Sequence, residues 1–290
     1  PSVNTELERA VAAARNAEAA VIVTGFPEGE GRDRADLNLP AAQEELIKAV
    51  AAAGVPTVVV LMGGSAVTMN NWMGNVAGIV EAWYAGEEGG NAVADVLFGD
   101  YNPGGKLPIT FPQTVGQVPL YYNPKPSGRG YDYVSVSGKP LFPFGYGLSY
   151  TEFAHGNLRI VPEQIAPTQS VEISVEVQNV GTRAGDEVVQ LYLHDVAASV
   201  ARPLKELKGF RRVSLAPGPR NRRRALRGLP CRSLQPPCLG RSAEPPCLRH
   251  HALDPHLRLV RIYPPLRLRI SRRRPLSGGT RHPPEASLEE

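Results

Sequence analysis

Three short, largely apolar runs near the N-terminus constrain the fold of this chain more than any other feature. They are AAVIVT at 19–24, PTVVVLM at 56–62 and GIVEAWY at 78–84. A strand of this composition is buried on both faces, unlike one that alternates apolar and polar residues. Segments of helical length separate the runs, so the sequence predicts a parallel sheet covered by helices on both faces.

The segments around these runs carry helix signals. Pro40 stands near the start of one segment and Gly54 at its end, which is the usual asymmetry of a helix. Gly99 ends another segment in the same way. Helices are therefore predicted over three segments: 5–17, 39–54 and 89–99.

The pattern changes to strict alternation from about Leu158. Apolar residues at 171, 173, 175 and 177 face one way and polar residues at 172, 174 and 176 face the other. Such strands predict an immunoglobulin- or fibronectin-like β-sandwich. The pattern stops near Gly218, after about four or five of the seven strands of such a fold.

The predicted fold class is therefore α/β. It is a three-layer α/β sandwich with a mostly parallel sheet, followed by an incomplete all-β immunoglobulin- or fibronectin-like sandwich and an irregular tail. Short aromatic segments after Lys106 are predicted to be connecting segments and edge strands. The predicted boundaries are 1–120 for the α/β domain, 121–157 for a connecting segment, 158–218 for the partial β domain and 219–290 for the tail.

The last part of the chain has a composition of its own. From Val213 to Glu290 there are 16 Arg, no Lys, five acidic residues, all three Cys and 13 of the 28 Pro. The rest of the chain holds 16 basic and 23 acidic residues, so the overall net charge of +4 says little about the folded part. We hypothesise that a GC-rich gene is read in a shifted frame from near Gly218. Such a tail is expected to be largely disordered.

Two other functions are conceivable for a tail of this composition, a metal site and nucleic-acid binding. A metal site would use five side chains: Cys231, Cys238, Cys247, His250 and His251. The cysteine spacings of seven and nine residues contain no CxxC pair, so no metal site is expected. The arginines could bind phosphates, but Tyr263 is the tail's only aromatic residue, so nucleic-acid binding is the weaker alternative. No apolar run approaches 18 residues, and no membrane span is expected.

The loop GFPEGEGRDRADLNLP at 25–40 is the candidate functional segment. It follows the first apolar run, and ligands approach open α/β sheets at the carboxyl ends of their strands. Glu30 stands between Gly29 and Gly31, which give the backbone conformational freedom. On the residues alone, Glu30 is either a solvated loop acid or a catalytic carboxylate.

Four runs, in this order, resemble glycoside hydrolase family 3, the β-glucosidase and β-xylosidase group. They are GEGRDRADLNLPAAQEELIKAV, EAWYAGEEGGNAVADVLFGDYNPGGKLPITFP, PLFPFGYGLSYTEF and VEVQNVGTRAGDEVVQLYL. The resemblance covers roughly residues 5–218. In this family a (β/α)8 barrel precedes a six-stranded α/β sandwich domain, and many members add a fibronectin-type module. This chain resembles the last two parts only.

The resemblance implies a retaining glycosidase, which uses two carboxyl groups about 5–5.5 Å apart. The family's nucleophile is an Asp on the barrel, and its general acid/base follows a strand of the sandwich domain, in a GEG context in many members. Glu30 in EGEGRDR matches the acid/base position, with Glu28 as the fallback. Asp33 and Arg34 are expected to shape the loop through hydrogen bonds and an ion pair, or else to contact sugar.

The resemblance also implies the partners of the chain. The substrate would be a β-linked oligosaccharide or aryl glucoside, no metal or organic cofactor is needed, and the missing barrel would be a structural partner. We expect no glycosidase activity from this chain alone, because it lacks the nucleophile. The rival interpretation is a non-catalytic carbohydrate-binding or scaffold module.

Two further motifs have structural explanations. The glycines of GEEGGNAVADV are not in the order of a phosphate-binding loop, and Glu87 and Glu88 lie near the positive end of a predicted helix. Trp72 and Trp83 adjoin predicted buried strands. We therefore expect them in the core rather than against sugar.

Overall fold

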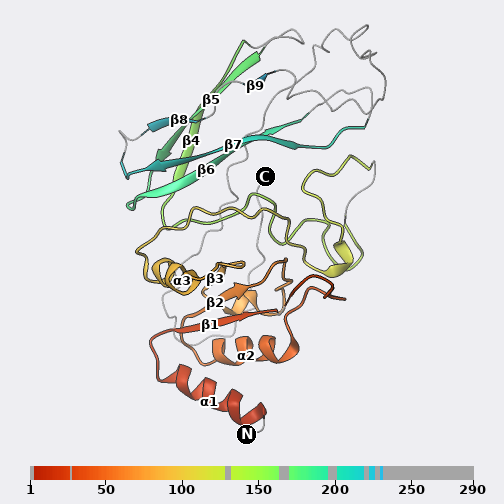
Figure 1. Cartoon of the computed structure of the whole chain (residues 1–290), viewed down its shortest axis with the longest axis vertical. Helices are drawn as coiled ribbons and strands as arrows, with labels where there is room; N and C mark the ends of the chain where they lie inside the picture. The colour runs from red at the N-terminus through yellow and green to blue at the C-terminus, as the bar shows by residue number, and fades with distance from the viewer. Residues whose placement is uncertain are drawn as a thin grey trace, which may run out of the picture.

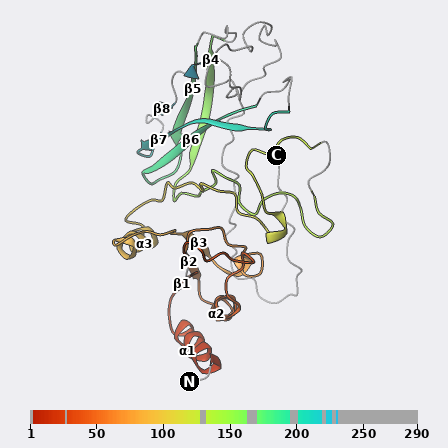
Figure 2. The same ribbon diagram turned by 45° about the vertical axis from the view of Figure 1, so that its right-hand side comes forward.

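The structure, a computed structural model, describes residues 3–26, 28–127, 132–162, 170–194 and 201–218, and the backbone of 222–225 and 229–230. An α/β part and a β part are joined by an extended connecting segment (Figure 1). A second view shows the N-terminal helix and the β part at opposite ends of the molecule (Figure 2).

The α/β part follows the predicted alternation of helices and strands. The helix predicted over 89–99 ends with Gly99 as its C-cap residue. Gly99 has a φ of 84°, the left-handed conformation that glycine adopts readily. The predicted helices and strands are confirmed, with ends shifted by a few residues. In chain order they are α1 (Val3–Arg15), β1 (Ala20–Gly25), α2 (Ala41–Ala51), β2 (Thr57–Met62), the 3-10 helix η1 (Met73–Asn75), β3 (Gly78–Glu81) and α3 (Gly89–Phe98).

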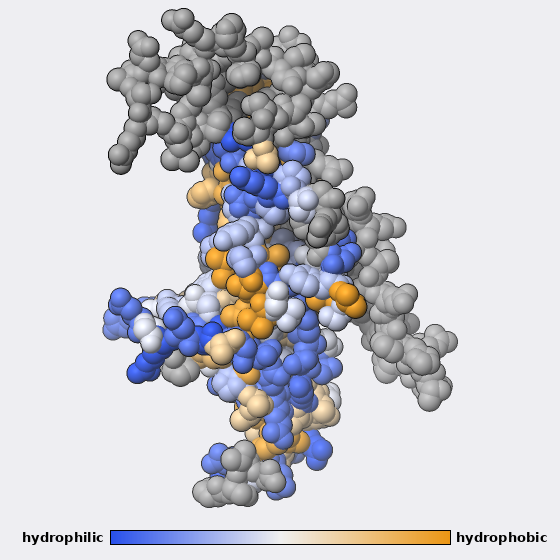
Figure 3. Space-filling view, turned by 90° about the vertical axis from the view of Figure 1, so that its right-hand side faces the viewer, coloured by the Kyte–Doolittle hydropathy of each residue, from blue (hydrophilic) through white to orange (hydrophobic). Residues whose placement is uncertain are grey.

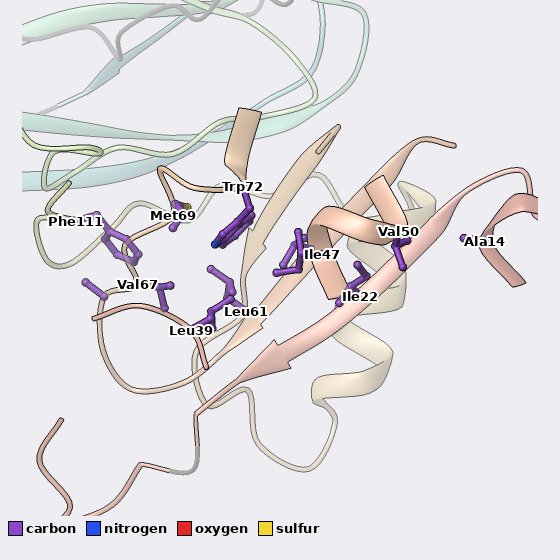
Figure 4. Close-up of a cluster of buried hydrophobic side chains, with 12 residues drawn as sticks. Ala14, Ile22, Leu39, Ile47, Val50, Leu61, Val67, Met69, Trp72 and Phe111 are labelled. Carbon is purple, nitrogen blue, oxygen red and sulfur yellow. The ribbon is translucent and has the colours of Figure 1, made fainter. Parts of the chain in front are cut away.

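The three strands form a parallel sheet in the order β1, β2, β3. One core lies between this sheet and α2 and extends through Trp72 to Phe111 (Figure 4). Ile47 of α2 is fully buried there, which contributes about 1.5–3 kcal/mol for a side chain of this size. On the other face of β1, Val21 and Val23 are 51% and 60% exposed, so the described residues cover that face only in part.

β3 is shorter than the run predicted over 78–84. It ends at Glu81, and two residues later Trp83 has a φ of 52°, which is incompatible with an extended strand. The chain turns there, so Glu81 lies at the carboxyl edge of the sheet.

The connecting segment of the structure runs from the end of α3 to the start of β4, and its described residues contain no strand, so the edge strands predicted after Lys106 are wrong there. It contains one 3-10 helix, η2 (Val115–Gln117), and an isolated bridge between Phe111 and Phe142. Aromatic contacts replace a strand ladder, as where Tyr122 stacks on Phe144 with ring centroids 4.3 Å apart. On the face drawn in Figure 3, hydrophobic side chains gather at this middle level of the molecule.

The β part consists of antiparallel strands. β4, β5 and β8 form one sheet, β9 also pairs with β5, and β6 pairs with β7. The predicted alternation on β5 is confirmed for the inward residues at 171, 173, 175 and 177, which are at most 2% exposed, and for Glu172, which is exposed, whereas Ser174 is also buried. The strands are β4 (Phe153–Val161), β5 (Ser170–Asn179), β6 (Gly185–Leu193), β7 (Glu206–Leu215), β8 (Arg222–Ala225) and β9 (Leu229–Pro230).

β8 and β9 lie beyond Gly218, where the sequence pattern of the β domain stops. The residues of these two strands show no alternation that would predict a strand. They pair with β5 through their backbone groups, and backbone pairing does not depend on side-chain composition. The rest of the 219–290 tail, with its three cysteines, His250, His251 and Tyr263, lies outside the described residues. The frameshift and the disorder of the tail remain hypotheses.

A buried ion pair ties the connecting segment to the β part. Lys106 Nζ lies 3.4 Å from Glu187 Oε2, and the two side chains are 8% and 4% exposed. Lys106 Nζ also donates to the carbonyl oxygen of Gly147 at 3.0 Å. Burial raises the pKa of Glu187 although the charge of Lys106 opposes the rise. His155 lies beside this pair, with its Nε2 4.0 Å from Glu187 Oε1. Burial and the positive charge of Lys106 both lower the pKa of His155.

Candidate active-site loop

The candidate loop lies at the carboxyl edge of the parallel sheet. Strands of a parallel sheet end on the same side, so the segments after β1, β2 and β3 meet there. They bring together the loop that follows β1, the glycine-rich turn after β2, and the turn after Glu81.

Glu28 is the anchored carboxylate of this loop, and its side chain is only 14% exposed. Its Oε1 lies 3.1 Å from Arg34 Nε and accepts a hydrogen bond from the Ser65 hydroxyl. Its Oε2 accepts from the Gly64 backbone N–H and, at 3.4 Å, from the Tyr84 hydroxyl. All three segments of the sheet edge therefore hold this one side chain.

These contacts decide the charge state of Glu28. Burial alone would raise the pKa of its carboxyl group. The hydrogen bonds from Ser65 and Gly64 and the positive charge of Arg34 outweigh burial and hold the pKa of Glu28 below its usual value. Glu28 is thus ionised at neutral pH.

Arg34 is the cation that ties the loop to the turn after β2. Its Nη2 donates to the Ser65 hydroxyl and, at 3.2 Å, to the carbonyl oxygen of Ala66. Its guanidinium carbon lies 3.6 Å from the centroid of the Phe26 ring, a cation–π arrangement. The loop-shaping ion pair expected of Arg34 is present, but its partner is Glu28, whereas Asp33 is exposed.

Glu30 occupies the opposite environment from Glu28. It is exposed in a turn that the Arg32 N–H closes by donating to the Gly29 carbonyl oxygen at 3.0 Å. Gly31 has a φ of 73°, which strains most other residues. Within the described ranges, no hydrogen bond or ion pair engages the Glu30 side chain, so its carboxylate is free to meet another molecule.

Glu81 is a further carboxyl group at this edge, which the sequence reasoning missed. Its Oε1 accepts from the Trp83 backbone N–H at 3.3 Å, whereas its Oε2 is buried without a partner among the described residues. Burial raises the pKa of Glu81 to about 7; the Trp83 hydrogen bond opposes this rise and the charge of Glu28 adds to it. The signal was an acid at the end of an otherwise apolar strand, GIVE.

Comparison with known families identifies both parts of the chain. A family model described as the glycosyl hydrolase family 3 C-terminal domain matches residues 3–150. The chain belongs to glycosyl hydrolase family 3. A second model, described as a fibronectin type III-like domain, matches residues 187–224. The resemblance and the fold class predicted from the sequence are confirmed.

Two curated relatives show how much of a family 3 protein is present. A β-xylosidase of Formosa agariphila is 48% identical over 216 residues, covering 72% of this chain and 30% of that protein. A periplasmic β-glucosidase of Salmonella typhimurium is 44% identical over 227 residues, covering 74% of this chain and 30% of that protein. The chain thus spans about 30% of the length of these relatives.

Solved β-glucosidase structures show the same partial coverage. A β-glucosidase of Erythrobacter marinus superposes with a TM-score of 0.74 at 41% identity, covering 79% of this chain and 32% of that chain. A β-glucosidase of Listeria innocua in complex with glucose gives a TM-score of 0.74 at 34% identity, covering 79% of this chain and 33% of that chain.

The remaining residues considered for this family 3 chain lie in the core or at the start of a helix. Trp72 is fully buried, and Trp83 packs on the same core and meets the Phe111 ring edge-on at 6.1 Å, as expected. Glu88 is the N-cap residue of α3 and Glu87 precedes it, at the positive end of that helix. No described group of three or more His, Cys, Asp or Glu could hold a metal ion, and no described helix could span a membrane.

Proposed function

We propose that this chain is the C-terminal part of a retaining family 3 β-glycosidase and that Glu30 is its general acid/base. The relatives named β-glucosidase and β-xylosidase support hydrolysis of terminal β-glycosidic bonds in the parent protein. The 30% share of their length supports the view that the barrel with the nucleophile lies outside this chain.

The contrast between Glu28 and Glu30 carries the assignment. A general acid/base must exchange protons with substrate and water, so its carboxyl group has to be accessible. Glu28 is held by four groups and kept ionised, whereas Glu30 is exposed and unengaged on a turn between two glycines. Glu28 and Arg34 then serve to hold the loop from which Glu30 projects.

The proposed reaction has two steps. Glu30 protonates the oxygen of the departing group while a carboxylate of the barrel attacks the anomeric carbon and forms a glycosyl-enzyme intermediate. The Glu30 carboxylate then removes a proton from water, which attacks the same carbon and releases the sugar with its configuration retained. No cofactor takes part.

Azide rescue in the barrel-containing parent protein tests the role of Glu30. Glu30→Ala should slow hydrolysis of a nitrophenyl β-glucoside by roughly 10²–10⁴-fold. Azide should restore turnover and yield a β-glucosyl azide, because this small anion attacks the intermediate without a base. Glu28→Ala is the matched variant and should not be rescued. Rescue of Glu28→Ala but not of Glu30→Ala would show that Glu28, and not Glu30, is the general acid/base.

A second test uses the chain as it stands. The pure chain should not hydrolyse a nitrophenyl β-glucoside, because a retaining mechanism needs both carboxyl groups. Hydrolysis that persists through purification and is lost in Glu30→Ala would show that the nucleophile is in this chain and would refute the proposed division.

A further inference from the structure

A cavity of about 530 Å³ lies beside the candidate loop, between the end of β1 and the start of α2. This volume is within the usual range for small-molecule sites, which combine an apolar wall with a few polar groups. Here Phe26 supplies an apolar wall, and five side chains supply polar groups: Arg34, Asp36, Asn38, Glu44 and Asn71.

Two of these side chains have polar atoms that no described residue satisfies. Glu44 is 8% exposed, and its Oε2 accepts from Asn71 Nδ2 at 3.3 Å and lies 3.7 Å from Lys48 Nζ. Its Oε1, however, is buried without a partner, and so is Arg34 Nη1. Buried polar groups in proteins are normally hydrogen-bonded. Both side chains line the cavity, and their unsatisfied atoms are an acceptor on Glu44 and a donor on Arg34.

The charges and hydrogen-bonding groups of the lining limit the chemistry of that molecule. One arginine and two carboxylates give the lining a net negative charge, which disfavours a phosphate or a carboxylate ligand. A ligand in the cavity would have to donate to Glu44 and accept from Arg34, and hydroxyl groups can do either. In addition, α2 begins at Ala41 and its N-cap residue, Pro40, provides no side-chain cap, so the first N–H groups of the helix lie at this end.

We infer that this cavity binds one neutral sugar unit, with Glu44, Asn71 and Arg34 as its polar contacts. The choice of a sugar among neutral polyols rests on the proposed glycosidase function. Arg34 both lines the cavity and holds Glu28 and Ser65. A sugar in the cavity would therefore contact the same guanidinium group that holds the loop carrying Glu30.

Titration of the isolated chain with methyl β-D-glucoside and methyl β-D-xyloside, followed by amide NMR, tests the inference. Saturable shifts are expected at residues around the start of α2 and at Gly64 and Ser65. Glu44→Gln should weaken binding about five- to tenfold, because a charge-assisted hydrogen bond becomes a neutral one. Glu45→Gln is the matched control, since Glu45 is exposed on the same helix, and it should bind as the unchanged chain does.

Three outcomes would overturn the inference. They are no saturable shifts at high sugar concentration, shifts confined to another surface, and equal binding of sorbitol, which lacks a sugar ring. If Glu44→Gln does not fold, Asn71→Ala provides the same comparison. The sugar titration tests the cavity, and azide rescue tests the role of Glu30. The two experiments can therefore give different answers: sugar binding without a catalytic Glu30, or a catalytic Glu30 without sugar binding in the cavity.

Discussion

Replacing Glu81 by glutamine should make the stability of the α/β part less dependent on pH. Burial and the neighbouring charge of Glu28 raise the pKa of Glu81 to about 7. At about 1.36 kcal/mol per pH unit, a rise from 4.5 to about 7 corresponds to about 3 kcal/mol. Because the side chain is partly exposed, solvent screening reduces the expected effect to about 2 kcal/mol.

The direction of the effect follows from the proton balance. The folded chain holds the Glu81 proton more tightly than the unfolded chain does. Below about pH 4.5 both states are protonated and the favourable contribution is complete. Between pH 4.5 and about 7 the unfolded state loses its proton first, so this contribution is lost as the pH rises. Glutamine has no such proton, so Glu81→Gln should gain stability relative to the unchanged chain over this window.

Urea unfolding followed by tryptophan fluorescence measures this difference. Both tryptophans, Trp72 and Trp83, lie in the α/β part, so the signal reports on the part that contains Glu81. The free energies of unfolding of the two proteins should be similar near pH 4.5 and differ by about 2 kcal/mol at pH 8. Glu87→Gln controls for the loss of one exposed negative charge. A difference that stays constant from pH 4.5 to 8 would refute the reasoning.

Two further perturbations test the packing. Ile47→Ala should cost about 2–5 kcal/mol in the same urea assay and Ile47→Val only about 0.5–1.5, because Ile47 is fully buried; equal costs would contradict the assigned packing. Lys106→Met should cost about 3–5 kcal/mol, because it removes the lysine charge that compensates the buried Glu187 carboxylate. Adding Glu187→Leu should recover most of that loss in a calorimetric unfolding experiment, and failure to recover would show that the cost is steric.

Local patterns in the sequence were sufficient for most of the architecture. Apolar runs of strand length between amphipathic segments predicted the parallel sheet, and the alternation at 171–177 predicted β5, because both patterns record which face is buried. The edge strands predicted after Lys106 failed. In that segment, proline and glycine interrupt the backbone pairing and aromatic rings pack on one another instead.

The sequence by itself determined the two fold types, the burial of Trp72, and the loop that holds the candidate carboxylates. Only the tertiary structure decided how those carboxylates differ. Arg34 pairs with Glu28 rather than with its neighbour Asp33, and Glu81 comes to the same sheet edge from 53 positions beyond Glu28. The physical reason is that charge state depends on burial and on partners brought together by parallel strand pairing, and sequence separation does not encode these distances.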